Sequence, residues 1–281
     1  MQYIVDGLLI GCVYGLAAMG MSLIWGVMDV INLAHGVLIT LGSFGVYLLC
    51  TSLGINPYVA VLIAGAFGLL AGVGIFKGAV QRVLDTSSLS TLLATFSVNM
   101  ILIGLGTQVF STNPRALDVN LGSLTIGSVT IQVTRLVAAL ASIVIACGLY
   151  LFLYRTSPGK SIRAITNNRA AAELVGIPSQ RMLALSFGLG SMLAALAGGL
   201  IATIFPFTIL SGDSYQLKSF VIVVLGGLGN PLGSLLGGLI LGAMEGILPA
   251  FISTSWVPVF EFVLFVIILI VKPTGLFGAK K

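Results

Sequence analysis

Two asparagine-containing interruptions of apolar sequence are the segments best suited to contact a polar solute. Gly26 to Gly36 contains Asn32, and Gly226 to Gly233 contains Asn230, each bracketed by glycines. In membrane helices unwound backbone is tolerated only where it faces protein or a wet cavity, and paired interruptions of this kind mark a substrate path. Asn32, Gly36 and Asn230 are therefore candidate path residues. The alternative, which the sequence leaves open, is a capping or packing role without substrate contact.

Titratable residues near these interruptions are few. His35 is the only histidine. A lone histidine does not build a metal site, so a hydrogen bond at a helix start is favoured over a proton relay, although His35 stays a candidate path residue. Glu245 lies within an apolar tract, where an acid should face the interior of a helix bundle. It either lines the path or, as we slightly favour, pairs with a neighbouring hydroxyl.

Acid–base catalysis is not expected. Four acids are scattered through apolar sequence: Asp6, Asp29, Glu245 and Glu261. They form neither paired carboxylates nor a histidine–acid constellation, so the sequence predicts no catalytic residue and no metal site. Gly159-Lys160-Ser161 matches the last three positions of a phosphate-binding loop, but Tyr154 replaces the required first glycine and no strand precedes it. We therefore expect neither ATP nor another cofactor on this chain.

The composition indicates what must position these residues. Hydrophobic residues make up 58% of the 281 positions and charged residues 7%, with a mean hydropathy of +1.14. A soluble domain has roughly a quarter of its residues charged, so lipid must be the solvent for most of this chain. Period-2 alternation is absent, which excludes a barrel. The sequence predicts one all-α polytopic membrane domain over residues 1–281, with about 8–9 transmembrane helices, some discontinuous or re-entrant.

Basic residues orient the predicted spans. With nine passes and an outside N-terminus, ten of the 13 basic residues lie on the inner side: Lys77, Arg82, Arg155, Lys160, Arg163, Arg169, Arg181, Lys272, Lys280 and Lys281. The other three, Arg115, Arg135 and Lys218, lie outside. This bias places the C-terminus in the cytoplasm. Because these residues sit in short loops, the net charge of +5 does not indicate nucleic acid binding. Gly26 to Gly36 is counted as a turn on the inner side of the membrane, although a broken helix within the bilayer, which would change the number of passes, fits as well. Another loop is expected around Ser211 to Tyr215.

The longest polar segment, residues 155–181, contains a predicted short helix. Asn167 or Asn168 can cap it, an alanine-rich stretch follows, and Gly176 ends it. A helix of about two turns is marginal alone in water, so we expect it to dock into another protein. The candidate docking residues are Arg169, Ala171, Ala172, Glu173 and Gly176. The alternative is an amphipathic linker at the membrane surface.

This segment resembles the cytoplasmic coupling loop of ABC-importer permeases, specifically the branched-chain amino acid type. The resemblance rests on Gly159 to Ile165 and Ala170 to Ile177, and it extends to Gly26 to Gly36, Val224 to Gly233 and Lys272 to Gly278. These segments span nearly the whole chain in the family's order, and they are most similar to the LivH-like member of a two-permease pair. One position departs from the pattern: Arg169 or Ala170 stands where related permeases often carry the Glu of a Glu-Ala-Ala motif. The resemblance therefore implies the docking geometry but not a Glu-mediated contact.

The resemblance implies a permease subunit of an ABC importer for branched-chain or other apolar amino acids in the bacterial cytoplasmic (inner) membrane. It implies a second LivM-like permease, two LivG- and LivF-like ATPase subunits and a LivJ-like extracytoplasmic binding protein. Two alternatives remain: a permease of the same family for urea or short amides, and a passive channel for a small neutral solute. The predicted docking helix argues against the channel, which needs none.

Overall fold

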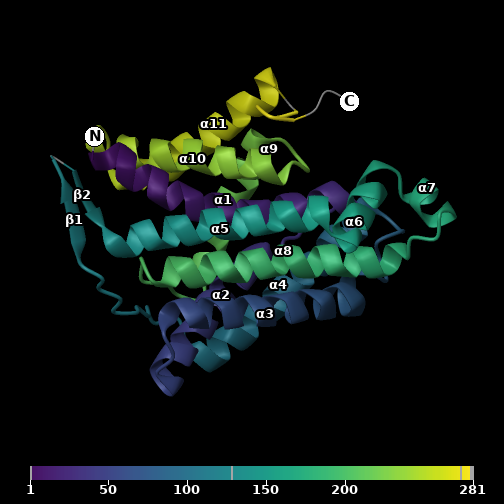
Figure 1. Ribbon diagram of the computed structural model, residues 1–281, viewed down its shortest axis with the longest axis horizontal. Helices are drawn as coiled ribbons and strands as arrows, with labels where there is room; N and C mark the ends of the chain where they lie inside the picture. The colour runs from purple at the N-terminus through teal and green to yellow at the C-terminus, as the bar shows by residue number, and fades with distance from the viewer. Residues whose placement is uncertain (1, 128, 273, 279–281) are drawn as a thin grey trace.

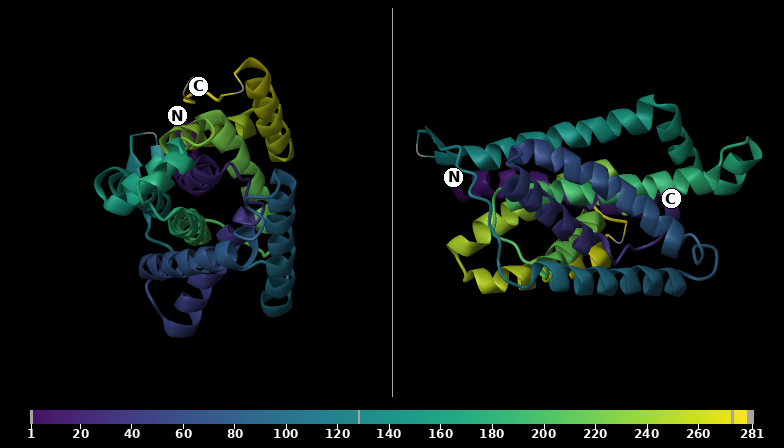
Figure 2. Two further views of the ribbon diagram at one scale, coloured as in Figure 1. Left: turned by 90° about the vertical axis from the view of Figure 1, so that its right-hand side faces the viewer. Right: turned by 90° about the horizontal axis from the view of Figure 1, so that it is seen from below.

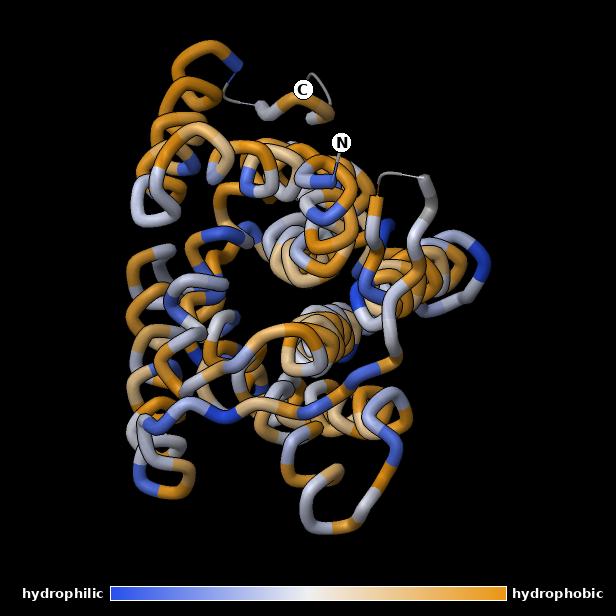
Figure 3. Tube along the Cα trace, turned by 90° about the vertical axis from the view of Figure 1, so that its left-hand side faces the viewer, coloured by the Kyte–Doolittle hydropathy of each residue, from blue (hydrophilic) through white to orange (hydrophobic). Residues whose placement is uncertain are grey.

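The computed structural model describes residues 2–127, 129–272 and 274–278, and in that part of the chain it is almost entirely helical (Figure 1). Eight of the described helices are long and apolar enough to cross a membrane, which confirms the predicted all-α polytopic class. Hydrophobic positions dominate these helices in Figure 3. Pro273 of the C-terminal motif and the basic residues Lys280 and Lys281 lie outside the described residues.

The elements follow one another in this order: α1 (Gln2–Met28), α2 (His35–Leu53), α3 (Pro57–Ile75) with a π-helical turn η1 (Phe76–Val80), α4 (Ser88–Phe110), β1 (Ser123–Ile126), β2 (Val129–Gln132), α5 (Val133–Arg155), α6 (Ser157–Asn167), α7 (Arg169–Leu174), α8 (Ser179–Ala202), α9 (Ser211–Gly226), α10 (Pro231–Ile247), the 3-10 turns η2 (Leu248–Ala250) and η3 (Thr254–Trp256), and α11 (Val257–Val271). The long helices run along the longest axis of the molecule, with the antiparallel β1–β2 hairpin at one end and α7 at the other (Figure 1). These are called the hairpin end and the α7 end below.

The first predicted interruption is a broken passage through the bundle. α1 continues through Gly26 to Met28, and Asp29 then takes a left-handed backbone with φ 52°. The chain turns back without helical structure until α2 begins at His35, whose ring Nε2 donates a 2.9 Å hydrogen bond to the carbonyl of Ala17 in the middle of α1. Residues 29–34 and α2 together therefore cross the bundle once, so the interruption combines a turn at the end of α1 with an unwound segment inside the bundle, and the count of nine passes is kept.

A second broken passage lies between α8 and α9. Residues 203–210 follow α8 without regular helix, and α9 begins at Ser211, inside the predicted loop from Ser211 to Tyr215. Gly212 in the first turn of α9 packs against Gly36 in the first turn of α2. α2 and α9 thus begin side by side within the bundle and run to opposite ends. With α9 counted there are nine passages, although only eight helices in the described part of the chain, α2 among them, are long enough to span on their own.

The N-terminal half of the bundle, α1 to α4, and the C-terminal half, α8 to α11, repeat one packing arrangement in opposite directions. α1 packs antiparallel on α10, where Gly11 lies against Gly238, and α3 packs antiparallel on α8, where Gly72 lies against Gly188. α4 and α11 occupy the same side of the molecule in both views of Figure 2. Small residues at these crossings let the helix backbones approach closely, as expected of membrane helices.

We predict that the closest of these contacts determine stability. Gly198 of α8 lies against the backbone carbonyl of Ile39, so a Cβ at this position would overlap that oxygen. Gly198→Ala should lower the free energy of unfolding in detergent by about 1–3 kcal/mol through overpacking. Gly148→Ala is the matched control, because a Cβ there meets no atom of the described residues within 4 Å. Equal thermal stability of the two variants would contradict the packing argument.

The charge bias also predicts which end of the bundle faces the cytoplasm. Asn120 lies exposed at the hairpin end and Gln180 lies exposed at the α7 end. With Cys12, Cys50 and Cys147 replaced, an impermeant maleimide should label Asn120→Cys in intact cells and should label Gln180→Cys only after permeabilisation. The opposite labelling pattern would reverse the orientation.

Candidate functional site

Asn32 lies at the point where the two broken passages meet, fully buried. Its side-chain Oδ1 accepts a 3.0 Å hydrogen bond from the backbone N–H of Ala34, and its carbonyl accepts one of 3.2 Å from the N–H of His35. The side chain of Gln216, from α9, completes the arrangement. Its Nε2 donates to the carbonyl of Asn32 at 3.3 Å, and its Oε1 accepts from the N–H of Gly36 at 2.6 Å. We call Asn32 to Gly36 together with Gln216 the central junction.

α4 closes the central junction from a second side. The hydroxyl of Thr95 accepts a 3.3 Å hydrogen bond from the N–H of Leu33. Asn99 lies one turn further along the same face of α4 and is only 7% exposed. Among the described residues, Asn32 Nδ2 and His35 Nδ1 are buried without a hydrogen-bond partner. The junction therefore has spare polar groups, which buried sites ordinarily satisfy with protein, water or a ligand.

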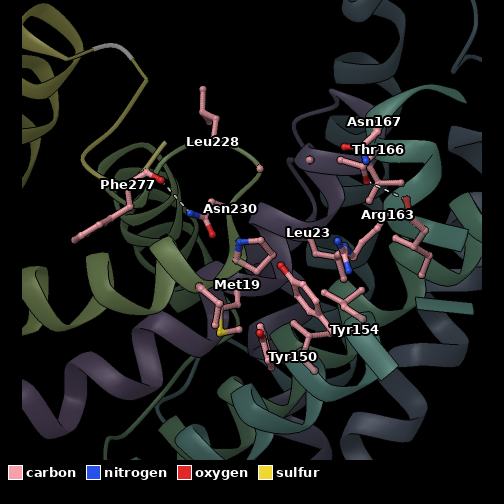
Figure 4. A pocket seen from close by; sticks show the side chains of 18 residues that line it. Met19, Leu23, Tyr150, Tyr154, Arg163, Thr166, Asn167, Leu228, Asn230 and Phe277 are labelled. Carbon is pink, nitrogen blue, oxygen red and sulfur yellow. Dashed lines mark hydrogen bonds between the residues drawn. The ribbon is translucent and has the colours of Figure 1, made fainter. Parts of the chain in front are cut away.

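Asn230 lies apart from Asn32, at the α7 end. Its Oδ1 caps α10 by accepting a 3.1 Å hydrogen bond from the N–H of Gly233, and its Nδ2 donates to the carbonyl of Phe277 at 3.0 Å. It lines a cavity of about 540 Å³ between α1, α5, α6 and the start of α10 (Figure 4). In the wall of this cavity the guanidinium of Arg163 lies 4.0 Å from the centre of the Tyr154 ring. The structure therefore separates the two predicted asparagines.

Glu245 lies towards the hairpin end. Its Oε1 is 2.6 Å from Lys218 Nζ, an ammonium partner that the sequence did not predict. Lys218 comes from α9 and also lies 3.5 Å from Oε1 of Glu261, which is buried. Sequence reasoning assigned Lys218 to an outer loop, because no periodicity shows that a lysine side chain extends along a buried helix. Asn230, the central junction and Glu245 thus lie at three successive depths.

The predicted docking helix forms as α7 at the far end of the bundle. Asn168 caps it, with Oδ1 accepting from the N–H of Ala171 at 3.0 Å, and Gly176 follows it with a left-handed φ of 84°. Ala172 is buried against the bundle, while Ala171 is exposed. Leu174 and Val175 are 89% and 77% exposed. The cap and the buried alanine hold the helix in place and leave these apolar side chains free.

Arg169 fastens α7 to a neighbouring turn. Its Nη1 donates a 2.7 Å hydrogen bond to Asp85, which follows η1, and its Nε donates one of 3.2 Å to Glu173 in the same helix. The hydrogen bond to Asp85 is the main reason that the pKa of Arg169 is raised above its ordinary value. Sequence reasoning missed Asp85, because it lies far from Arg169 along the chain. Arg169 therefore has a positioning role within this chain.

We predict that the central junction depends on Gln216. Gln216→Leu leaves the N–H of Gly36 unsatisfied and the carbonyl of Asn32 with only the N–H of His35, and an unsatisfied buried group costs about 1–3 kcal/mol. Thermal unfolding in detergent should show a clear loss of stability. Gln216→Glu keeps the acceptor for the N–H of Gly36, so its thermal stability should lie between that of the wild type and that of Gln216→Leu. Gln108→Leu, an exposed glutamine in α4, is the matched control, and a loss as large there would contradict the prediction.

Comparison with known proteins agrees with this architecture. The family described as "Branched-chain amino acid transport system / permease component" matches residues 3–271. The high-affinity branched-chain amino acid transport system permease protein LivH of Salmonella typhimurium is 29% identical, and the alignment covers 99% of this chain and 95% of that protein. Its counterpart BraD of Pseudomonas aeruginosa is 26% identical with the same coverage.

More distant relatives share the fold. The ribose import permease protein RbsC of Bacillus subtilis is 27% identical over 82% of this chain and 72% of its own length. The solved structure of PsaBC from Streptococcus pneumoniae in complex with Fab superposes with a TM-score of 0.50 at 15% identity, covering 98% of this chain and 93% of that one. The family match spans nearly the whole chain, in the order of segments on which the resemblance rests. The chain belongs to the branched-chain amino acid transport permease family.

Proposed function

We propose that this chain is the transmembrane permease subunit of an ABC importer that carries branched-chain or other apolar amino acids across the cytoplasmic membrane. Separate ATPase subunits drive it, so the chain itself is not an enzyme. The family assignment supports the transport role. The observation that carries the proposal is α7, a capped two-turn helix that projects from the end of the bundle with two apolar side chains almost fully exposed.

The docking role follows from how α7 is held. A surface helix ordinarily buries its apolar residues, but Leu174 and Val175 are exposed. Arg169 forms an ion pair with Asp85, whose turn leads into α4, while Ala172 packs on the bundle. A partner that moves α7 therefore pushes on two separate parts of the membrane domain. This suits a subunit that receives work from an ATPase, whereas a passive channel needs no such element.

Three features form the proposed substrate path. The pocket that Glu245 lines lies nearest the hairpin end, Asn32, His35 and Gly36 lie at the central junction, and Asn230 lies at the α7 end. A zwitterionic amino acid offers an ammonium to carbonyls and carboxylates and a carboxylate to helix N-termini. Apolar walls accept the side chain without holding it tightly. Urea or a short amide is the alternative substrate, since both have polar groups that amides bind.

The proposed assembly contains a second LivM-like permease, two LivG- and LivF-like ATPase subunits on the α7 end and a LivJ-like binding protein on the hairpin end. The exposed faces of α4 and α11 leave room for a second membrane subunit: of all the candidate spans in the described part of the chain, these two are the least buried. The cytoplasmic position of the C-terminus is part of the same proposal, because the described residues that follow α11 lie beside Asn230, where the carbonyl of Phe277 accepts a hydrogen bond from Asn230 Nδ2.

We predict that Leu174→Asp uncouples the importer. The reconstituted complex should still insert and assemble, but ATP hydrolysis stimulated by the leucine-loaded binding protein should fall roughly tenfold or more, because a carboxylate must lose its water to enter an apolar contact. Leu174→Met preserves the apolar contact and is the matched control. Stimulation at the wild-type level in Leu174→Asp would mean that α7 is only a linker. ATP-independent flux of leucine through the wild-type complex would instead favour the passive channel.

A further inference from the structure

A pocket at the hairpin end has charged side chains of both signs in its wall. Its volume is about 330 Å³, and it lies between the hairpin ends of α1, α5 and α10 and the start of α11. Asp6 and Arg135 form an ion pair of 3.2 Å in this wall, and Lys218 pairs with Glu245 at 2.6 Å. All four residues line the cavity, which we call the charged pocket.

The charged pocket and its immediate surroundings lack one positive charge. Glu261 lies beside Lys218, its Oε1 3.5 Å from Nζ, with a side chain only 2% exposed. In the described structure this cluster therefore has three carboxylates, from Asp6, Glu245 and Glu261, against two cations. Glu261 is the buried member of the three, and a buried carboxylate is strongly destabilising unless a counter-charge is near. The excess of carboxylates favours an ammonium group on the Glu245 side of the charged pocket.

Two polar atoms of the charged pocket are also free to bind. Glu245 Oε2 and Arg135 Nε are both buried, and within the described residues neither has a hydrogen-bond partner. The first is an acceptor with negative charge and the second is a donor with positive charge. A ligand that carries a cationic donor and an anionic acceptor would form a charge-assisted hydrogen bond with each atom, whereas a neutral sugar or amide would form only weaker ones.

The rest of the charged pocket limits the size and character of its ligand. Ile10, Val257 and Pro258 contribute apolar surface beside the charges. Pockets for small molecules run from roughly 300 to 1,000 Å³, so a cavity near the lower limit suits a solute no larger than one amino acid. Its apolar wall suits an apolar side chain.

We propose that the charged pocket binds one zwitterionic amino acid with an apolar side chain, with its ammonium on Glu245 and its carboxylate on Arg135. This inference deepens the proposed function and rests on it, because it gives the importer a receiving site at the end where the binding protein would dock. Neither asparagine interruption takes part in this site. The specificity-determining residues would be Glu245 and Arg135, on α10 and α5.

The test is binding of leucine to the purified permease–ATPase complex without its binding protein. Saturation-transfer NMR on the leucine methyl protons detects weak binding. Leucine should bind, while 4-methylpentanoic acid, which lacks the ammonium, and 3-methylbutylamine, which lacks the carboxylate, should not displace it. Glu245→Gln and Arg135→Gln should each weaken binding about tenfold, since each removes a charge-assisted hydrogen bond. Asp118→Asn and Arg115→Gln, which remove one charge of each sign outside the charged pocket, are the matched controls and should bind normally.

Several outcomes would overturn the proposal. Unchanged leucine binding in both pocket variants would do so, as would displacement by either single-charge analogue. Binding of phosphoethanolamine, detected by saturation transfer on its own methylene protons, with no binding of leucine, would reassign the charged pocket to a lipid headgroup. If a variant does not fold, the analogue series on the wild-type complex still decides. ATP-driven leucine import into vesicles, measured in parallel, separates the two ideas: import without pocket binding refutes the pocket alone, and pocket binding without import refutes the proposed function alone.

Discussion

Backbone that leaves a helix inside a bilayer must find its hydrogen-bond partners within the protein, and the architecture of this chain depends on how that is done. Without a side-chain partner, the N–H of Gly36 would be unpaired where no bulk water reaches, and the carbonyl of Asn32 would have only the N–H of His35. One side chain, Gln216, serves both groups, and Thr95 serves the N–H of Leu33. Two helices that belong to opposite halves of the bundle are thereby tied to one unwound segment.

Close helix approach makes these bonds geometrically available. Gln216 reaches across because the first turns of α2 and α9 meet at Gly36 and Gly212 without intervening side chains. Glycine has little propensity for helices in water, but in a membrane the close contact that it permits replaces the hydrophobic driving force that is missing there. The glycine content of this chain is therefore a requirement of the junction, and not only a feature of its composition.

Much of the fold could be predicted from local sequence, whereas the partners of the site residues could not. Apolar runs predicted the spans, and Asn168 and Gly176 predicted both ends of α7. The interruption at Asn32 was also visible, since glycine and asparagine are poor helix formers. The second broken passage, residues 203–210, was not: the sequence pointed to Asn230 instead, which caps a helix at the end of the bundle. A local sequence pattern does not show how deep in the helix bundle an interruption lies.

Interactions between distant elements explain the remaining differences. Lys218 beside Glu245 and Asp85 beside Arg169 join residues that no periodicity relates. Each pair became visible only when helices far apart in the chain were packed together. The sequence therefore identifies candidate site residues as polar residues in apolar tracts, whereas their partners are found only in the tertiary structure.

The meeting of two helix starts at the central junction has an electrical consequence. Each helix N-terminus carries roughly half a positive charge, and α2 and α9 bring two of them together within the bundle, with Asp213 as the only acid in either first turn. A hydrated proton or sodium ion moving along the proposed substrate path would be repelled at the central junction, as in pores that exclude cations with half-helix dipoles. A membrane that stores energy as an ion gradient loses that gradient through any open pore that conducts ions. Paired helix starts let a carrier of uncharged or zwitterionic solutes open without discharging that gradient.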